Sequence, residues 1–155
     1  MEPTIADPTT WALDREIVLS RVYDAPRELV FDCMTDPAHL THFWGPAGVS
    51  TPIENITVDL RVGGVFETVM VNDANGEQYP SKGVYTEIDR PSALAWEEPG
   101  GMVNRSTFTD LGDDRTEVRI HQTNVPAMFR SPEAQAGMAS SFDRFAEYLN
   151  KQQHA

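Results

Sequence analysis

Cysteine is nearly absent from this sequence, and basic residues are scarce. The single cysteine, Cys33, excludes a disulfide within the chain and fits a reducing compartment. Only 12 lysines and arginines stand against 24 aspartates and glutamates, so the formal net charge is −12. Such a charge repels phosphate backbones and anionic membrane surfaces. We therefore expect neither nucleic acid nor a membrane among the partners of this protein.

Long apolar runs are missing as well. No run approaches the roughly 20 residues that span a bilayer, and the N-terminus lacks the basic and apolar regions of a signal peptide. A cytoplasmic protein is the expectation. Residues 1–14 carry Pro3 and Pro8 with little apolar periodicity, which predicts a flexible N-terminal arm. The remainder, residues 15–152, is predicted to be a single domain, since 155 residues with 40% hydrophobic side chains suit one core.

Motifs of nucleophilic and nucleotide chemistry are also absent. The sequence has no Gly-x-Ser-x-Gly elbow, no catalytic Cys/His signature and no phosphate-binding glycine loop. His39 and His42 lie three residues apart on a short predicted helix, near Asp36, and such a set could bind a metal. No further Cys/His cluster completes a tetrahedral site, so a solvated helix end is the preferred interpretation. We predict no metal and no cofactor, and the sequence assigns no catalytic residue.

The secondary-structure signals that are present predict an α+β fold. β-branched and aromatic residues predict a first strand at 15–24, and Pro26 and Asp36-Pro37 mark the starts of two short helices, the second ending at Trp44. Six more strands are predicted, at residues 53–60, 64–72, 78–89, 93–97, 105–111 and 115–123. Ser131-Pro132-Glu133 opens a long last helix. A curved antiparallel sheet of about seven strands would have one apolar face, and this helix is long enough to cover it.

The middle of the long helix is built from small residues. Gly137, Ala139, Ser140 and Ser141 follow one another closely, although an interior glycine costs about 1 kcal/mol relative to alanine. Small side chains permit close contact between helix and sheet, or they leave a cavity between the two. Composition leaves both interpretations open.

Strand parity selects the residues that would line such a cavity. Apolar and aromatic walls with a few polar groups are usual for a small-molecule pocket, whereas the alternative is an ordinary filled core. The predicted wall comprises one residue at the mouth, nine from the concave face of the sheet and three from the long helix: Trp44, Phe66, Thr68, Met70, Leu94, Trp96, Phe108, Val118, Ile120, Gln122, Met138, Phe142 and Phe145.

Several segments together resemble one protein family. Trp44-Gly45-Pro46, Gly63-Gly64 before Phe66, and the stretch from Tyr85 to Pro91 resemble the activator of heat-shock protein 90 ATPase homologue-like family, within the START-like (SRPBCC) superfamily. The resemblance extends over about residues 15–151. It implies a helix-grip (START/Bet v-like) fold that encloses a ligand. Gln122 departs from the family pattern, because a histidine is often seen there, which puts an inherited ligand preference in doubt.

The resemblance implies three functions, which stay open at this point. The first is a noncatalytic module that binds a small hydrophobic molecule of unknown identity. The second is a cyclase-, dehydratase- or hydrolase-like enzyme in the same cavity, with Glu67, Glu87, Arg105 and Tyr85 as acid, base or anion-contact groups if they point inward. The third is a cofactor that stimulates a chaperone ATPase by contacting that chaperone.

The connection before the long helix carries unusually large apolar side chains. Val125, Pro126, Met128 and Phe129 lie where an exposed loop is usually polar. Residues 125–130 could form a lid over the ligand or pad the lower core, and the sequence does not choose between them. The same apolar loop, or an exposed sheet edge, could instead serve a homodimer.

Overall fold

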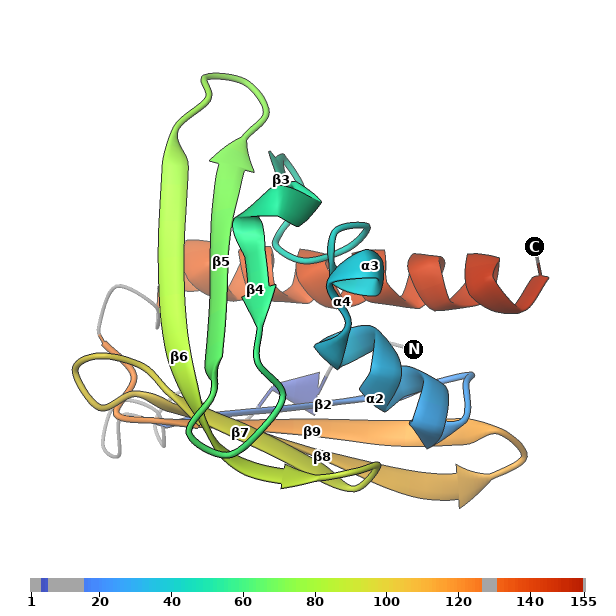
Figure 1. Cartoon of the computed structure of the whole chain (residues 1–155). Coiled ribbons are helices and arrows are strands. Elements are labelled where there is room, and N and C mark those ends of the chain that lie inside the picture. Colours follow the sequence, from blue (N-terminus) through green and yellow to red (C-terminus); the bar gives the residue numbers. More distant parts are fainter. Residues whose placement is uncertain (1–3, 6–15, 127–130, 155) are drawn as a thin grey trace.

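The computed structural model describes residues 4–5, 16–126 and 131–154, and its elements follow the predicted order (Figure 1). The elements are β1 (Thr4–Ile5), β2 (Ile17–Tyr23), α2 (Arg27–Thr35), α3 (Pro37–Leu40), β3 (Val49–Ser50), the 3-10 helix η1 (Ile53–Asn55), β4 (Ile56–Val58), β5 (Val65–Asn72), β6 (Gln78–Asp89), β7 (Ala93–Glu97), β8 (Val103–Gly112), β9 (Arg115–Thr123) and α4 (Pro132–His154). The bounds of β6, β7 and β9 coincide with the predicted strands. The predicted strand at 53–60 differs, because its first three residues form η1 and only Ile56–Val58 are extended.

The described strands form one antiparallel sheet. Their order is β1-β2-β9-β8-β7-β6-β5-β3, with β4 also paired to β5. Strands β5 to β9 are a meander, and β2 joins the far side of β9, so the first long strand pairs with the last. Figure 1 shows β5 and β6 rising steeply from the plane of β7, β8, β9 and β2. The register shift between Tyr85 and Glu87 lies in β6 near this bend, as expected where a bulge increases local twist.

The helices lie inside the angle of the bent sheet, which gives the predicted helix-grip α+β fold. Figure 1 shows α4 running along the concave side, with α2 and α3 beside its C-terminal half. The second short helix ends at Leu40, earlier than predicted, and a turn continues the chain to Trp44, whose N–H donates to the Leu40 carbonyl at 2.9 Å. Aromatic rings fill the space between these helices and the sheet: Phe43 stacks on Phe145 with ring centroids 4.4 Å apart.

The small residues of α4 contact a loop that lies far away in the sequence. A Cβ at Gly137 would lie 3.5 Å from the Cβ of Pro46, and Ser140 Oγ accepts a hydrogen bond from the Ala47 N–H at 3.1 Å. The Arg144 guanidinium donates to the carbonyl oxygens of Gly45, Pro46 and Val49 at 2.8, 3.0 and 3.2 Å. The slender stretch of the helix therefore makes room for the segment that follows Trp44, which neither interpretation of its composition anticipated.

Two predicted segments are described only in part. Within the predicted arm at residues 1–14, Thr4 and Ile5 pair with Ser20 and Leu19 of β2, and the rest of the arm lies outside the described residues. Within the predicted lid, Val125 is fully buried and packs with Ile17 and Leu19, whereas residues 127–130 lie outside the described residues. None of the helices in the described ranges is long and apolar enough to cross a membrane.

Candidate functional site

Inward-facing side chains of the sheet lie in rows that cross several strands. One row runs from Tyr85 through Trp96, Asn104 and Gln122 to Ile17, because each residue is the register partner of the next. The next row consists of Leu94, Ser106, Ile120 and Leu19. Alternating burial along β8, where Asn104, Ser106 and Phe108 are buried, fits this assignment of the concave face.

Ten of the thirteen residues predicted to line a cavity fall into two clusters on this face. Phe66, Leu94, Trp96, Phe108, Val118 and Phe145 are buried together, with Trp44 and Ile120 packed against them. Met138 and Phe142 of α4 belong to a second cluster around Ile17, Leu19 and Val125. Three residues complete the set: Thr68 is buried, Met70 is half-buried against Gly45, and Gln122 is half-buried in a hydrogen-bonded chain. Ligand binding by these residues stays a prediction.

Burial is uneven along the helix that covers the face. Phe145 and Leu149 are only 4% and 2% exposed, but no residue from Ser131 to Arg144 is fully buried, and Met138 and Phe142 are only partly buried although they face the sheet. The strands below show this trend only in part, because Ile17 and Leu19 of β2 are 1% and 3% exposed. Val118 of β9 is buried, whereas Ile120, two residues further on the same face, is only half-buried. The N-terminal half of α4 therefore leaves the concave face incompletely covered.

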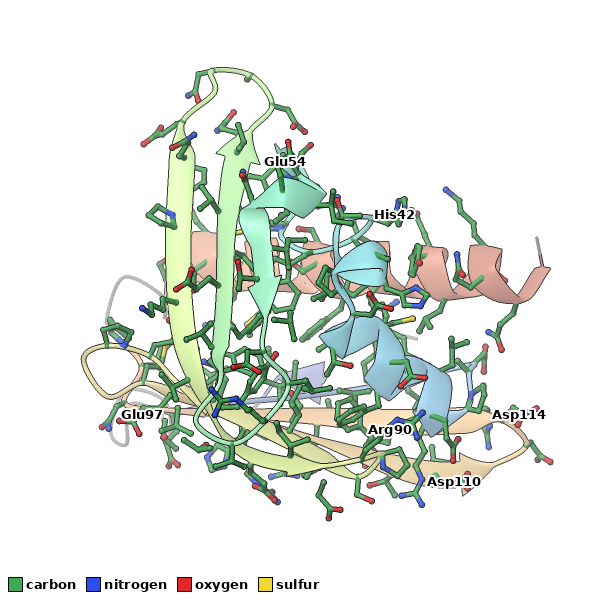
Figure 2. The ribbon with its side chains drawn as sticks, viewed as in Figure 1. His42, Glu54, Arg90, Glu97, Asp110 and Asp114 are labelled. Atoms are coloured by element: carbon green, nitrogen blue, oxygen red, sulfur yellow. The ribbon has the colours of Figure 1, made fainter. Side chains whose placement is uncertain are left out.

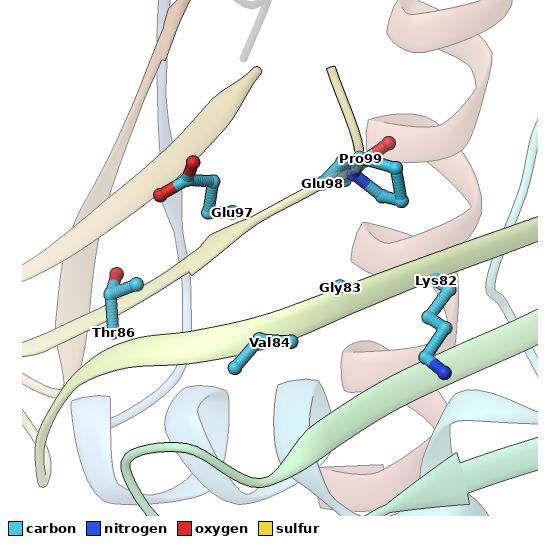
Figure 3. Close-up of a pocket in the computed structure, with 7 residues that line it drawn as sticks. All are labelled: Lys82, Gly83, Val84, Thr86, Glu97, Glu98 and Pro99. Atoms are coloured by element: carbon cyan, nitrogen blue, oxygen red, sulfur yellow. The ribbon is translucent and has the colours of Figure 1, made fainter. Parts of the chain in front are cut away.

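Two surface depressions are lined by described residues, and none of the thirteen predicted residues belongs to either. The first, of about 320 Å³, lies where β6 and β7 separate (Figure 3) and is lined by Lys82, Gly83, Val84, Thr86, Glu97, Glu98 and Pro99. The second, of about 310 Å³, lies between α3 and α4 and is lined by His42, Arg144, Glu147, Tyr148, Lys151 and Gln152. A cavity between α4 and the sheet thus stays a prediction, which the uneven burial supports.

A chain of polar side chains crosses the concave face beside the first depression. The Glu98 carboxylate oxygen Oε2 accepts hydrogen bonds from Trp96 Nε1 at 3.3 Å and from Asn104 Nδ2 at 3.0 Å. Gln122 Nε2 donates in turn to Asn104 Oδ1 at 2.6 Å. Burial raises the pKa of Glu98, and the two hydrogen bonds oppose this shift because they favour the carboxylate. Among the described residues of the concave face, no other carboxylate accepts hydrogen bonds from two inward-facing side chains.

Sequence reasoning found Trp96 and Gln122 but missed Glu98 and Asn104. The predicted strands ended at residue 97 and began again at 105, which left both polar residues in a presumed loop. In the structure the hairpin continues further, since the Glu98 N–H donates to the Met102 carbonyl at 2.8 Å and β8 starts at Val103. The signal that could have found Asn104 is the alternation that it shares with Ser106 and Phe108.

Of the four groups considered for acid, base or anion contacts, Tyr85 alone is buried on the concave face. Glu87 and Arg105 form a two-pronged ion pair, at 2.8 and 3.2 Å, on the opposite face. Glu67 pairs with Lys82 at 3.4 Å, and both side chains are largely exposed. The Tyr85 hydroxyl is buried and has no hydrogen-bond partner among the described residues, and burial raises its pKa. The condition for a catalytic role, an inward orientation, is not met for Glu67, Glu87 and Arg105, because strand parity turns these three residues outward as exposed strand residues.

His39 on α3 and His42 in the turn that follows α3 (Figure 2) make contacts with α4. His39 Nδ1 lies 2.5 Å from the Tyr148 hydroxyl, and the His42 ring stacks on the Tyr148 ring with centroids 5.4 Å apart. The Asp36 carboxylate accepts the Ala38 N–H at 2.9 Å and so caps α3. In the described ranges, no group of three or more His, Cys, Asp or Glu residues is placed to hold a metal ion. Burial raises the pKa of the Cys33 thiol to about 12, so this thiol is a poor nucleophile.

Together, the bent sheet, the two short helices and the gripping helix define the class of helix-grip α+β proteins. A family model described as Activator of Hsp90 ATPase homolog 1-like protein matches residues 24–150, and the chain therefore belongs to this family. No curated protein matches the chain.

Solved structures of bacterial proteins share the fold over nearly the whole chain. A protein from Rhodobacter sphaeroides has a TM-score of 0.81 at 16% identity, with 97% of this chain and 99% of that chain covered. One from Chromobacterium violaceum has a TM-score of 0.78 at 25% identity, covering 85% and 95%. An AHSA1-like protein from Aeromonas hydrophila has a TM-score of 0.77 at 20% identity, covering 89% and 94%.

Proposed function

We propose that this protein binds a small hydrophobic molecule between the concave face of its sheet and the N-terminal half of α4, without catalysing a reaction on it. The observation that carries the proposal is the incomplete burial of apolar side chains that face inward, above all Met138 and Phe142 on the helix and Ile120 on the sheet. A guest that covers this surface gains roughly 25 cal/mol for each Å² of apolar area removed from water.

The chemistry of the concave face favours binding over catalysis. Enzymes that work by proton transfer need an acid and a base within reach of the reacting atoms. Of the proposed acid, base and anion-contact groups, only Tyr85 is buried on this face, and Glu87 and Arg105 neutralise each other on the opposite face. A cyclase- or hydrolase-like enzyme and a chaperone cofactor stay as the other two hypotheses, and no contact among the described residues specifically favours either.

The proposal is tested first by identifying a bound molecule and then by blocking the region that it would occupy with a larger side chain. Purified protein is incubated with cell extract, and retained small molecules are detected by native mass spectrometry. A guest present at 100 times its dissociation constant should stabilise the fold by about 2.7 kcal/mol, which thermal unfolding measures.

A matched pair of substitutions on α4 locates the site. Met138→Trp places a large side chain in the incompletely covered region and should weaken binding about tenfold or more. Ala136→Trp adds the same group on the exposed side of the same helix and should leave binding unchanged. Equal affinity in the two variants, or no retained molecule in any extract, would refute the proposal.

A further inference from the structure

We propose that the polar chain formed by Glu98, Asn104 and Gln122 is a subsite for a protonated amine, so that the guest is an amphipathic molecule with an ammonium group at one end. This inference rests on the proposed function, because it assumes a guest between α4 and the sheet. It adds the chemical class of that guest and the residue that pairs with its charge.

The Glu98 carboxylate has no compensating cation among the described residues. Its Oε2 atom accepts two hydrogen bonds, but no described residue donates to its Oε1 atom, and no described lysine, arginine or histidine forms an ion pair with it. Lys82 lines the same depression, yet its Nζ pairs with Glu67 at 3.4 Å. A partly buried carboxylate is costly unless a cation or further hydrogen bonds compensate it.

Hydrogen bonds also hold the Glu98 carboxylate in a fixed orientation. Two backbone hydrogen bonds hold Glu98 in a tight turn. Its N–H donates to Met102 O at 2.8 Å, and its carbonyl accepts from Gly101 N at 3.0 Å. Trp96 Nε1 and Asn104 Nδ2 then hold the side chain as an acceptor. Both contacts favour the ionised form, which is the form that a cation requires. The carboxylate is thus oriented before any guest arrives.

An apolar surface lies beside the polar chain. Gln122 is the register partner of Ile17, and Ile17 belongs to the cluster that includes Met102, Met138 and Phe142. Polar and partly buried apolar groups therefore meet on one stretch of the concave face. An amine with a short hydrocarbon tail satisfies both, with the ammonium at Glu98 and the tail under α4. The net charge of −12 also attracts cations to the protein from a distance.

The test compares octylamine with octan-1-ol by isothermal titration calorimetry at about pH 7, where an alkylamine is protonated. The two probes have the same tail and differ in the charge of the head group. We expect the wild-type protein to bind octylamine about tenfold more tightly than octan-1-ol, as charge-assisted hydrogen bonds usually allow. Glu98→Gln keeps an acceptor for Trp96 and Asn104 but removes the charge, and it should abolish this preference while leaving octan-1-ol binding unchanged.

Glu97→Gln is the matched control. Glu97 is the exposed neighbour of Glu98 at the same depression (Figure 3), so its substitution changes the net charge equally but leaves the polar chain intact. The preference for octylamine should survive in this variant. If Glu97→Gln lowers the preference as much as Glu98→Gln does, general electrostatic attraction explains the result and the subsite is refuted.

A second measurement avoids any dependence on the folding of Glu98→Gln. Burial raises the pKa of Glu98, so this carboxylate is protonated sooner on acidification than an exposed one. The octylamine affinity of Glu97→Gln should therefore fall as the pH is lowered from about 7, while its octan-1-ol affinity stays constant.

The outcomes separate the two proposals. Equal binding of both probes to the wild-type protein refutes the amine subsite but leaves the hydrophobic container standing. Binding of neither probe refutes the container together with the subsite.

Discussion

The two ends of the concave face differ in how completely they are closed. At one end, α2, α3 and the C-terminal half of α4 pack Phe31, Phe43, Phe108 and Phe145 into a buried aromatic cluster. At the other end, Met138 and Phe142 in the N-terminal half of the same helix are only partly buried, although Ile17 and Leu19, against which they pack, are buried.

The same strands and the same helix pass through both ends, so secondary structure alone does not cause the difference. The closed end has two additional helices and interlocking rings, such as the edge-to-face pair of Phe31 and Phe108 with centroids 5.6 Å apart. Close packing there supplies stability that does not depend on the other end. The protein can therefore leave its open end partly uncovered without losing the fold.

The largest expected effect comes from truncating one aromatic residue at each end. Phe145→Ala removes a buried ring that contacts both Phe43 and Tyr23 and should cost about 3–5 kcal/mol of unfolding free energy. Phe142→Ala, one turn away on the same helix, should cost less than about 2 kcal/mol because its ring is only partly buried. Urea denaturation measures both values, and equal losses would contradict the contrast between the two ends.

A smaller effect is expected from the contact that joins α4 to the segment after Trp44. Arg144→Met keeps much of the side-chain volume but removes hydrogen bonds to three carbonyl oxygens, and it should cost about 2 kcal/mol. Lys151→Met removes a positive charge from an exposed position on the same helix and should change stability by less than about 0.5 kcal/mol. Similar thermal unfolding of the two variants would show that these carbonyl contacts do not hold the segment.

The smallest effect concerns two tyrosine hydroxyls. Tyr85→Phe removes a buried hydroxyl without a partner, so stability should stay the same or rise by up to about 1 kcal/mol. Tyr148→Phe removes a hydroxyl that contacts His39 Nδ1, and it should lower stability by about 1 kcal/mol. Chemical denaturation of both variants checks the opposite signs. A clear loss in Tyr85→Phe would mean that this hydroxyl has a stabilising partner after all.

Much of the sheet could be predicted from the sequence because local pattern determines it. The pattern of apolar residues predicted β6, β7 and β9. It also predicted that Phe66, Leu94 and Val118 face the concave side, where they are buried. Asp36 before Pro37 likewise signalled the start of α3, since the Asp36 carboxylate caps that helix.

Contacts between distant segments could not be predicted in this way. Gly137 and Ser140 were read as a sign of close packing on the sheet or of a cavity, but their neighbours are Pro46 and Ala47. The polar chain at Glu98 was missed for a different reason. Glutamate and asparagine are poor strand formers, so residues next to the turn at Gly100 and Gly101 were assigned to a loop although the hairpin includes them.

The pairing of β2 with β9 has a consequence for how the chain folds during synthesis. Ile17 has its partner in Gln122, so β2 leaves the ribosome long before the strand that completes its hydrogen bonds exists. The meander of β5 to β9 can form from neighbouring hairpins, whereas closing the β2–β9 pair requires nearly the whole chain. Until then only β1 pairs with β2, and the edge of β2 that faces β9 is unpaired and rich in β-branched residues, which is the kind of segment that nascent-chain chaperones protect from aggregation.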